Sequence, residues 1–117
     1  MRIRNANIYT EEHRFVRGDA AVENGRFVSC TGDPAGDEAV VDAEGMYLIP
    51  GLVDIHFHGC KGADMCDGTK EALDVITSYE ASVGVTSVCP ATMTIPKDEL
   101  LEVMKNAGSY EYSGGSH

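Results

Sequence analysis

The sequence predicts an α/β protein in two parts, a small β-sheet or sandwich over residues 1–48 and a βαβ segment over residues 49–117. Short apolar runs separated by turn residues fill the first part, whereas helical periodicity appears only after Pro50-Gly51. The second part runs strand, helix, strand, helix, an order that is typical of parallel βαβ construction.

Four strands are predicted in the first part, over residues 2–9, 19–22, 26–30 and 39–42. Asn24-Gly25 predicts a tight hairpin turn between the second and third strands, because this pair tolerates the positive φ angles that such turns need. A loop is expected over residues 32–37 and a turn at Glu44-Gly45.

Two helices are predicted in the second part. The first has Thr69 as its N-cap, Gly84 just beyond its end, and apolar residues at helical spacing: Ala72, Leu73, Ile76, Tyr79 and Val83. The second has Pro96 in its first turn, ends before Gly108, and lines one face with Leu100, Val103, Met104 and Ala107. Between the helices, residues 84–94 are predicted to form a buried strand and a threonine-rich loop, and the polar residues 109–117 a connection.

Two imidazoles stand two residues apart at the end of an apolar run, in the segment 48–59. Alternate side chains of a β-strand share one face, so Asp54, His56 and His58 are expected to project together. Because neutral imidazole is a good ligand for divalent metals, the pattern predicts that His56 and His58 bind one metal ion, with Asp54 in support. The alternative is that both histidines cap a core strand and hydrogen-bond locally.

The neighbouring polar residues are weaker candidates for a role in metal binding or catalysis. Cys60 is an alternative third ligand, disfavoured because hydrolytic sites usually add carboxylate or histidine. Asp64 and Asp67 are expected to form turns and caps rather than an acid–base pair, because their loop is rich in glycine. Thr92 and Thr94 are expected to pack or cap in their loop, with substrate binding as the alternative.

Pro50–Gly59 resembles the metal-binding signature of the amidohydrolase superfamily. The continuation over residues 58–69, with Gly84-Val-Thr-Ser87 and Pro90–Thr94, is similar to N-acetylglucosamine-6-phosphate deacetylases. This resemblance implies the first two units of a (β/α)₈ barrel, whose active site lies at the carboxyl ends of the strands. It also implies a divalent metal, zinc first with iron, manganese or cobalt as alternatives, that activates water to release acetate from the sugar.

In that family the remaining ligands, a glutamate and further histidines, and the acid–base aspartate lie on later strands, so this chain is expected to contain no catalytic residue. A barrel needs about 250 residues, so the 117 residues are expected to be the front part of a longer enzyme and inactive alone. The resemblance also implies a homodimer when the enzyme is complete, and the His-x-His form permits either one or two metal sites there. The alternatives are a dihydroorotase- or deaminase-like amidohydrolase, or a non-catalytic fragment that self-associates through uncovered strand edges.

The composition narrows the partners. A formal net charge of −10 argues against nucleic acid or an anionic membrane but permits a phosphorylated amino sugar; Lys61 is the only basic residue of the 59–69 loop. No apolar stretch is long enough to span a bilayer, and the start lacks a signal peptide's hydrophobic region, so a cytoplasmic location is expected. The four cysteines include no Cys-x-x-Cys pair, and Cys30 and Cys89 are expected to be buried thiols.

Overall fold

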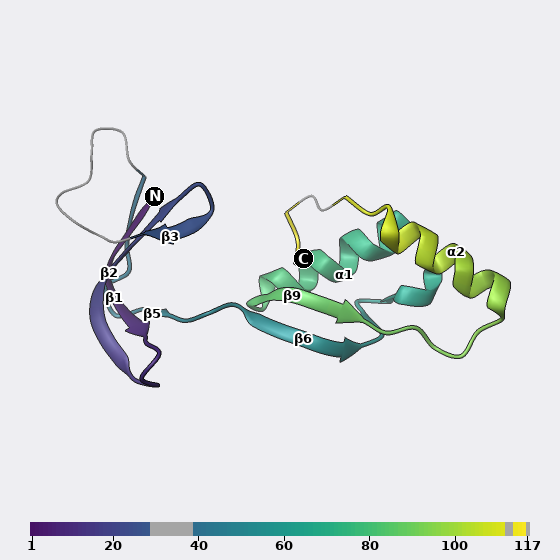
Figure 1. The fold of residues 1–117 in the computed structure, drawn as a ribbon, viewed down its shortest axis with the longest axis horizontal. Helices are drawn as coiled ribbons and strands as arrows, with labels where there is room; N and C mark the ends of the chain where they lie inside the picture. The colour runs from purple at the N-terminus through teal and green to yellow at the C-terminus, as the bar shows by residue number, and fades with distance from the viewer. Residues whose placement is uncertain (29–38, 112–113, 117) are drawn as a thin grey trace. The chain divides into compact units, whose positions relative to one another are not determined.

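The computed structural model describes residues 1–28, 39–111 and 114–116, and it divides into two compact units, Met1–Pro50 and Gly51–His117 (Figure 1). The mixed α/β architecture predicted from the sequence is confirmed, with strands in the first unit and strands and helices in the second. The predicted loop over residues 32–37 and Cys30 lie outside the described residues. None of the helices in the described part is long and apolar enough to cross a membrane.

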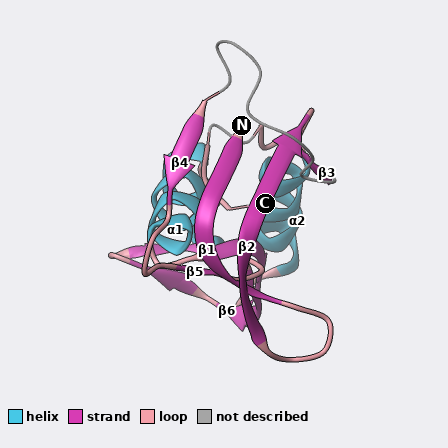
Figure 2. Cartoon of the chain, turned by 90° about the vertical axis from the view of Figure 1, so that its left-hand side faces the viewer, coloured by secondary structure: helices cyan, strands magenta, loops and turns pink. Residues whose placement is uncertain are grey.

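The first unit contains one five-stranded sheet (Figure 2). Its strands are β1 (Arg2–Tyr9), β2 (Phe15–Glu23), β3 (Arg26–Val28), β4 (Val40–Asp42) and β5 (Tyr47–Leu48). The order is β3-β2-β1-β4, with antiparallel pairing from β3 to β1, while β4 and β5 both pair with β1 in parallel. β2 begins earlier than predicted, and β5 was not predicted because two residues carry no detectable period.

Both predicted turns of this unit are present. Asn24 and Gly25 have φ angles of 49° and 73°, which joins β2 to β3 in the expected tight hairpin. At the second turn the Met46 amide donates to the Ala43 carbonyl oxygen at 2.9 Å, and Gly45 has a φ of 77°. These positive φ angles explain the choice of glycine at both turns.

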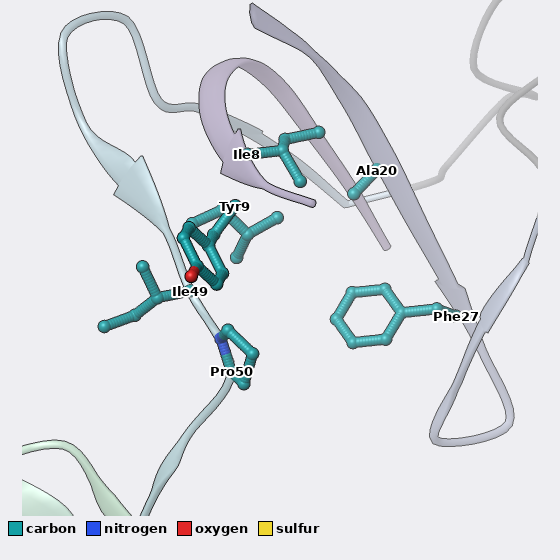
Figure 3. A pocket seen from close by; sticks show the side chains of 7 residues that line it. Ile8, Tyr9, Ala20, Phe27, Ile49 and Pro50 are labelled. Carbon is teal, nitrogen blue, oxygen red and sulfur yellow. The ribbon is translucent and has the colours of Figure 1, made fainter. Parts of the chain in front are cut away.

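The core of the first unit is small. Among the described residues of this unit the buried apolar side chains are alanines, Ala6, Ala21 and Ala43, whereas Phe27 is 71% exposed. A hollow of about 260 Å³ lies against the sheet, lined by Ile8, Tyr9, Ala20, Phe27, Leu48, Ile49 and Pro50 (Figure 3). Because methyl groups bury little area, this unit has few apolar contacts to stabilise it.

The second unit is built on a parallel strand pair (Figure 1). Its elements are β6 (Leu52–Phe57), β7 (Gly59–Cys60), β8 (Ala63–Asp64), η1 (Met65–Asp67), α1 (Lys70–Ser82), β9 (Val85–Pro90) and α2 (Lys97–Gly108). α1 connects β6 to β9, which pair in parallel, so the predicted βαβ arrangement is confirmed. β7 and β8 form a short antiparallel hairpin that was not predicted.

The helix boundaries follow their caps closely. The Thr69 hydroxyl accepts a hydrogen bond from the Ala72 amide at 3.2 Å, and Gly84 has a φ of 91° just past the C-cap, so both predictions for α1 are confirmed. Pro96 is the N-cap of α2 rather than a member of its first turn. Gly108 is the last helical residue rather than the first beyond it.

The core of the second unit lies where η1, α1 and α2 meet. Met65, Leu73 and Val103 are buried together there, with Ile95, Ala107 and Tyr110 packed against them. Met104 was predicted to share the buried face of α2 but is 54% exposed. Val103 is the only buried residue of α2. The face that α2 packs against the core is therefore narrower than its apolar pattern indicates.

The last described residues, 114–116, pack against α1 and β9. Ser116 is 1% exposed; its amide donates to the Thr77 carbonyl oxygen at 3.0 Å and its hydroxyl to the Val85 carbonyl oxygen at 2.5 Å. A Cβ atom on Gly115 would collide with the Thr77 side chain, so this close approach requires glycine. The expectation of a simple connection was incomplete here, because single polar residues show no period that would predict their burial.

Candidate metal centre

The carboxyl end of β6 carries two imidazole rings side by side. His56 lies on β6 and His58 directly follows its last residue. The ring centroids are 5.3 Å apart and the ring planes meet at 83°. His56 is exposed and His58 is half-buried. The structure therefore brings the two predicted ligands together at one strand end.

The strand is irregular at this point. The pairing of β6 with β9 shifts register between Asp54 and Phe57, where Asp54 pairs with Val88 and Phe57 with Pro90. Such irregularities bend a strand and re-aim its side chains, and they are frequent beside active sites. The simple alternation assumed for Asp54, His56 and His58 is therefore interrupted within the motif itself.

A backbone carbonyl selects the tautomer of the neutral His58 ring. His58 Nδ1 lies 2.9 Å from the Ala91 carbonyl oxygen, in the segment after β9. A carbonyl oxygen only accepts, so Nδ1 carries the proton and donates it. In the neutral ring Nε2 then holds a free lone pair, which is the atom that a metal requires. The sequence contains no signal for this contact, because any residue at position 91 would offer a carbonyl.

Asp54 contacts the backbone of the histidine pair rather than either ring. Its Oδ1 accepts from the His56 amide at 3.0 Å. The carboxylate thus holds the backbone at His56, which is a form of the support expected from the sequence.

The loop after His58 is more ordered than its glycine content indicates. A Cβ at position 59 would collide with the Ala63 carbonyl oxygen, so the close approach of β8 requires glycine there. Lys61 and Gly62 have φ angles of 54° and 81°, so the hairpin turn uses the left-handed region twice.

Asp64 and Asp67 cap η1. Asp64 Oδ1 accepts from the Cys66 amide at 2.7 Å, and Asp67 Oδ2 accepts from the Asp64 amide at 2.8 Å. This reciprocal capping confirms the expectation that the two aspartates form the turn and cap it. Both carboxylates already accept backbone amides.

The surroundings of Cys60 and Lys61 affect their chemistry in different ways. Burial raises the pKa of the Cys60 thiol, and the Glu80 carboxylate raises it further. A protonated thiol is a poor metal ligand, which argues against Cys60 in that role. The Lys61 ammonium lies 4.8 Å from the centre of the Tyr79 ring, a cation–π contact.

Outside this loop, one expectation was wrong and another was met only in part. Cys89, predicted to be a buried thiol, is exposed on β9, which pairs only with β6 among the described residues. The expected capping by Thr92 or Thr94 is also not found: Pro96 is the N-cap of α2 and no side chain caps that helix. Thr94 is exposed and Thr92 half-buried.

His56 and His58 fit the nitrogen ligands of a divalent metal site but form only part of one. A tetrahedral site needs four ligands, and a catalytic site takes three from the protein. Across residues 1–28, 39–111 and 114–116, no three histidine, cysteine or carboxylate side chains are grouped to hold an ion. The described residues therefore supply two neighbouring nitrogen donors and no third ligand.

The comparison with solved structures shows the class of fold. The chain matches an N-acetylglucosamine-6-phosphate deacetylase of Pasteurella multocida with a TM-score of 0.81 and 22% identity, over 98% of this chain and 32% of that one. The fold is therefore that of the N-terminal portion of an amidohydrolase structure. No protein-family model matches the chain.

The sequence comparisons point to particular relatives. An N-acetylglucosamine-6-phosphate deacetylase of Vibrio furnissii is 33% identical over 67 residues, 57% of this chain and 17% of the relative. That of Bacillus subtilis is 27% identical over 113 residues, 93% of this chain and 28% of the relative. A dihydroorotase of Lactobacillus gasseri is 32% identical over 105 residues, 88% of this chain and 23% of the relative.

This chain is therefore similar to the N-terminal region of the deacetylases and of other amidohydrolases. It spans less than a third of the length of each of these relatives.

Proposed function

We propose that this chain is the N-terminal part of a metal-dependent amidohydrolase that converts N-acetylglucosamine 6-phosphate to glucosamine 6-phosphate and acetate. One observation carries the proposal: His56 and His58 lie side by side at the end of β6, with His58 Nε2 left free by the bond to Ala91. The similarity to deacetylases over most of the chain supports it.

His56 and His58 would hold a divalent metal, with zinc as the first choice and iron, manganese or cobalt as alternatives. When bound, such a metal lowers the pKa of water to near neutrality and polarises the acetamide carbonyl. The Ala91 carbonyl orients the His58 ring, and Asp54 holds the backbone at His56. The remaining ligands and the acid–base aspartate belong, in this proposal, to later strands of a (β/α)₈ barrel.

The proposal includes the partners expected from the sequence. The substrate is a small phosphorylated amino sugar, the complete enzyme is a cytoplasmic homodimer, and neither nucleic acid nor membrane is a partner. The Thr92 and Thr94 hydroxyls follow β9, at the same end of the strand pair as the histidines, and are offered as hydrogen-bond partners for the substrate.

The test is acetate release from N-acetylglucosamine 6-phosphate by the complete gene product that contains this chain. His56→Ala and His58→Ala should each lower turnover by about 100-fold or more, because losing a ligand misplaces the metal. His13→Ala, an exposed histidine of the first unit, is the matched control and should leave turnover unchanged. Turnover of dihydroorotate or of an aminopurine without acetate release would contradict the proposal.

The second candidate is a dihydroorotase- or deaminase-like amidohydrolase, which the similarity to the Lactobacillus gasseri dihydroorotase favours. Such an enzyme would use the same histidine pair. The 59–69 loop and residues 90–94 favour the deacetylase, since their sequences resemble that group. Turnover measured separately with N-acetylglucosamine 6-phosphate, dihydroorotate and an aminopurine decides between the two.

A further inference from the structure

A cysteine joins the two loops that follow β6 and β9. The Met93 amide donates to Cys66 Sγ at an N to S distance of 3.1 Å. Cys66 belongs to η1, in the connection from β6 to α1, and Met93 lies between β9 and α2. Sulfur is a weak acceptor, so the bond holds its geometry only if both sides are fixed by other contacts.

The Cys66 side is fixed. Its amide donates to Asp64 Oδ1 at 2.7 Å, within the reciprocal capping by Asp64 and Asp67. Met65, the preceding residue, is 6% exposed in the core of the unit, and its amide donates to the His58 carbonyl oxygen at 2.8 Å. The sulfur therefore stands on a short turn that is anchored to both the core and the histidine segment.

The other side is fixed at Ala91. The Ala91 amide donates to the Phe57 carbonyl oxygen at 2.7 Å, and the Ala91 carbonyl oxygen accepts from His58 Nδ1 at 2.9 Å. Met93 follows two residues later, so the segment 91–93 is held at one end by β6 and His58 and at the other end by Cys66. The position of the Ala91 carbonyl thus depends on both attachments.

We infer that Cys66 is a positioning residue for His58: by holding the segment 91–93, it keeps the Ala91 carbonyl where it fixes the Nδ1-protonated form of the ring. The inference rests on the proposed function, in which His58 Nε2 binds a metal. Partners that contact a ligating histidine directly contribute tenfold to 100-fold in metal affinity. Cys66 acts one link further away, so its removal should weaken zinc binding about three- to tenfold.

The test compares Cys66→Ala, Cys66→Ser and the control Cys89→Ala in the full chain. The control removes an exposed thiol from β9. The readouts are hydrogen exchange of the Met93 amide, the imidazole ¹⁵N shifts of His58, and the zinc Kd. Cys66→Ala should speed Met93 exchange at least tenfold, mix the two His58 tautomers and weaken zinc binding. Cys66→Ser supplies an oxygen acceptor and should restore all three, and Cys89→Ala should match the wild type.

Unchanged Met93 exchange and an unchanged His58 tautomer in Cys66→Ala would overturn the inference. If that variant does not fold, the wild type decides, because a Met93 amide that exchanges as fast as that of exposed Thr94 contradicts the tie. The proposed function fails by a different result, namely a wild-type zinc Kd that His56→Ala and His58→Ala both leave unchanged.

Discussion

Two side chains near the end of β6 are suited by their surroundings to different chemistry. His58 Nδ1–H donates a hydrogen bond to the Ala91 carbonyl oxygen, so Nε2 keeps its lone pair. Cys60, two residues later, has a thiol whose pKa is raised by burial and by the Glu80 carboxylate. The His58 ring therefore presents a nitrogen lone pair at Nε2, while the raised pKa favours the protonated form of the Cys60 thiol.

The raised pKa of Cys60 predicts its reactivity. Only the thiolate is alkylated, so iodoacetamide should label Cys60 half-maximally at a pH above the value of about 8.5 for a free cysteine. Glu80→Gln removes the nearby negative charge and should move that pH downward. Peptide mass spectrometry after timed labelling between pH 7 and pH 10 measures both. A Cys60 that labels at or below the free-cysteine pH would contradict this prediction.

Asp42 links the first unit's stability to pH. The Asn5 side-chain amide and the Glu44 backbone amide donate to Asp42 Oδ1, and these bonds lower the pKa of its carboxyl. A carboxyl with a lowered folded pKa adds stability above its unfolded pKa of about 4, and loses it as pH falls through the folded value. The difference in Tm between the wild type and Asp42→Ala should therefore be larger at pH 7 than at pH 2.5. An equal difference at both pH values would show that the ionised carboxylate contributes nothing.

Some features of the candidate site could be predicted from local sequence, and others depend on contacts between distant segments. His56 and His58 were predicted as a pair because imidazole is rare and its spacing on a strand is informative. The Ala91 carbonyl and the Cys66 contact with Met93 were not predicted, because they depend on a tertiary meeting of two loops. The exposure of Cys89 was missed for a related reason: burial of a strand face is decided by what covers it.

α1 is the element whose prediction was most complete. Thr69 at its start and Gly84 after its end act locally, so the sequence alone predicts them. Of the predicted apolar face, Val83 is the C-cap and is 52% exposed. β5, β7 and β8 have only two residues each, and their pairing depends on β1 or on a tight turn between them. Two residues show no period, which is why these strands were not predicted.

A substitution at the N-cap of α1 tests whether the Thr69 hydroxyl stabilises the helix. Thr69→Ala removes the hydroxyl that accepts from the Ala72 amide, and it should lower the free energy of unfolding by about 1 kcal/mol. Thr94→Ala is the control, because Thr94 is exposed and lies outside both helices; its effect should stay within about 0.5 kcal/mol. Urea denaturation followed at 222 nm measures both. Equal effects would mean that the Thr69 hydroxyl does not stabilise the helix.

The molecule as a whole leaves much apolar surface uncovered. β6 and β9 pair only with each other among the described residues, and Val53 and Ile55 are 63% and 76% exposed. Unpaired strand edges beside exposed apolar side chains favour association. The amount of uncovered surface could be foreseen only through the resemblance to a larger barrel, since no local pattern reports it.

The isolated chain should therefore self-associate at micromolar concentrations and show no deacetylase turnover. Ile55→Lys places a charge on the exposed strand and should shift the chain toward the monomer. Ile55→Val changes the same position but keeps the apolar surface, so it is the matched control. Sedimentation velocity across a concentration series measures the shift. A monomer at every concentration would contradict the prediction, as would acetate release by the pure chain.

His56 and His58 are proposed to bind one metal ion together. The most direct measurement is a zinc titration of the full chain followed by the imidazole ¹⁵N shifts, with His13 as an internal reference. We predict weak binding of one equivalent that shifts Nε2 of His58 and a ring nitrogen of His56, leaves His13 unmoved, and is lost in the double variant His56→Ala/His58→Ala. Zinc binding that persists in the double variant, or shifts at His13 with none at His56 and His58, would contradict the account.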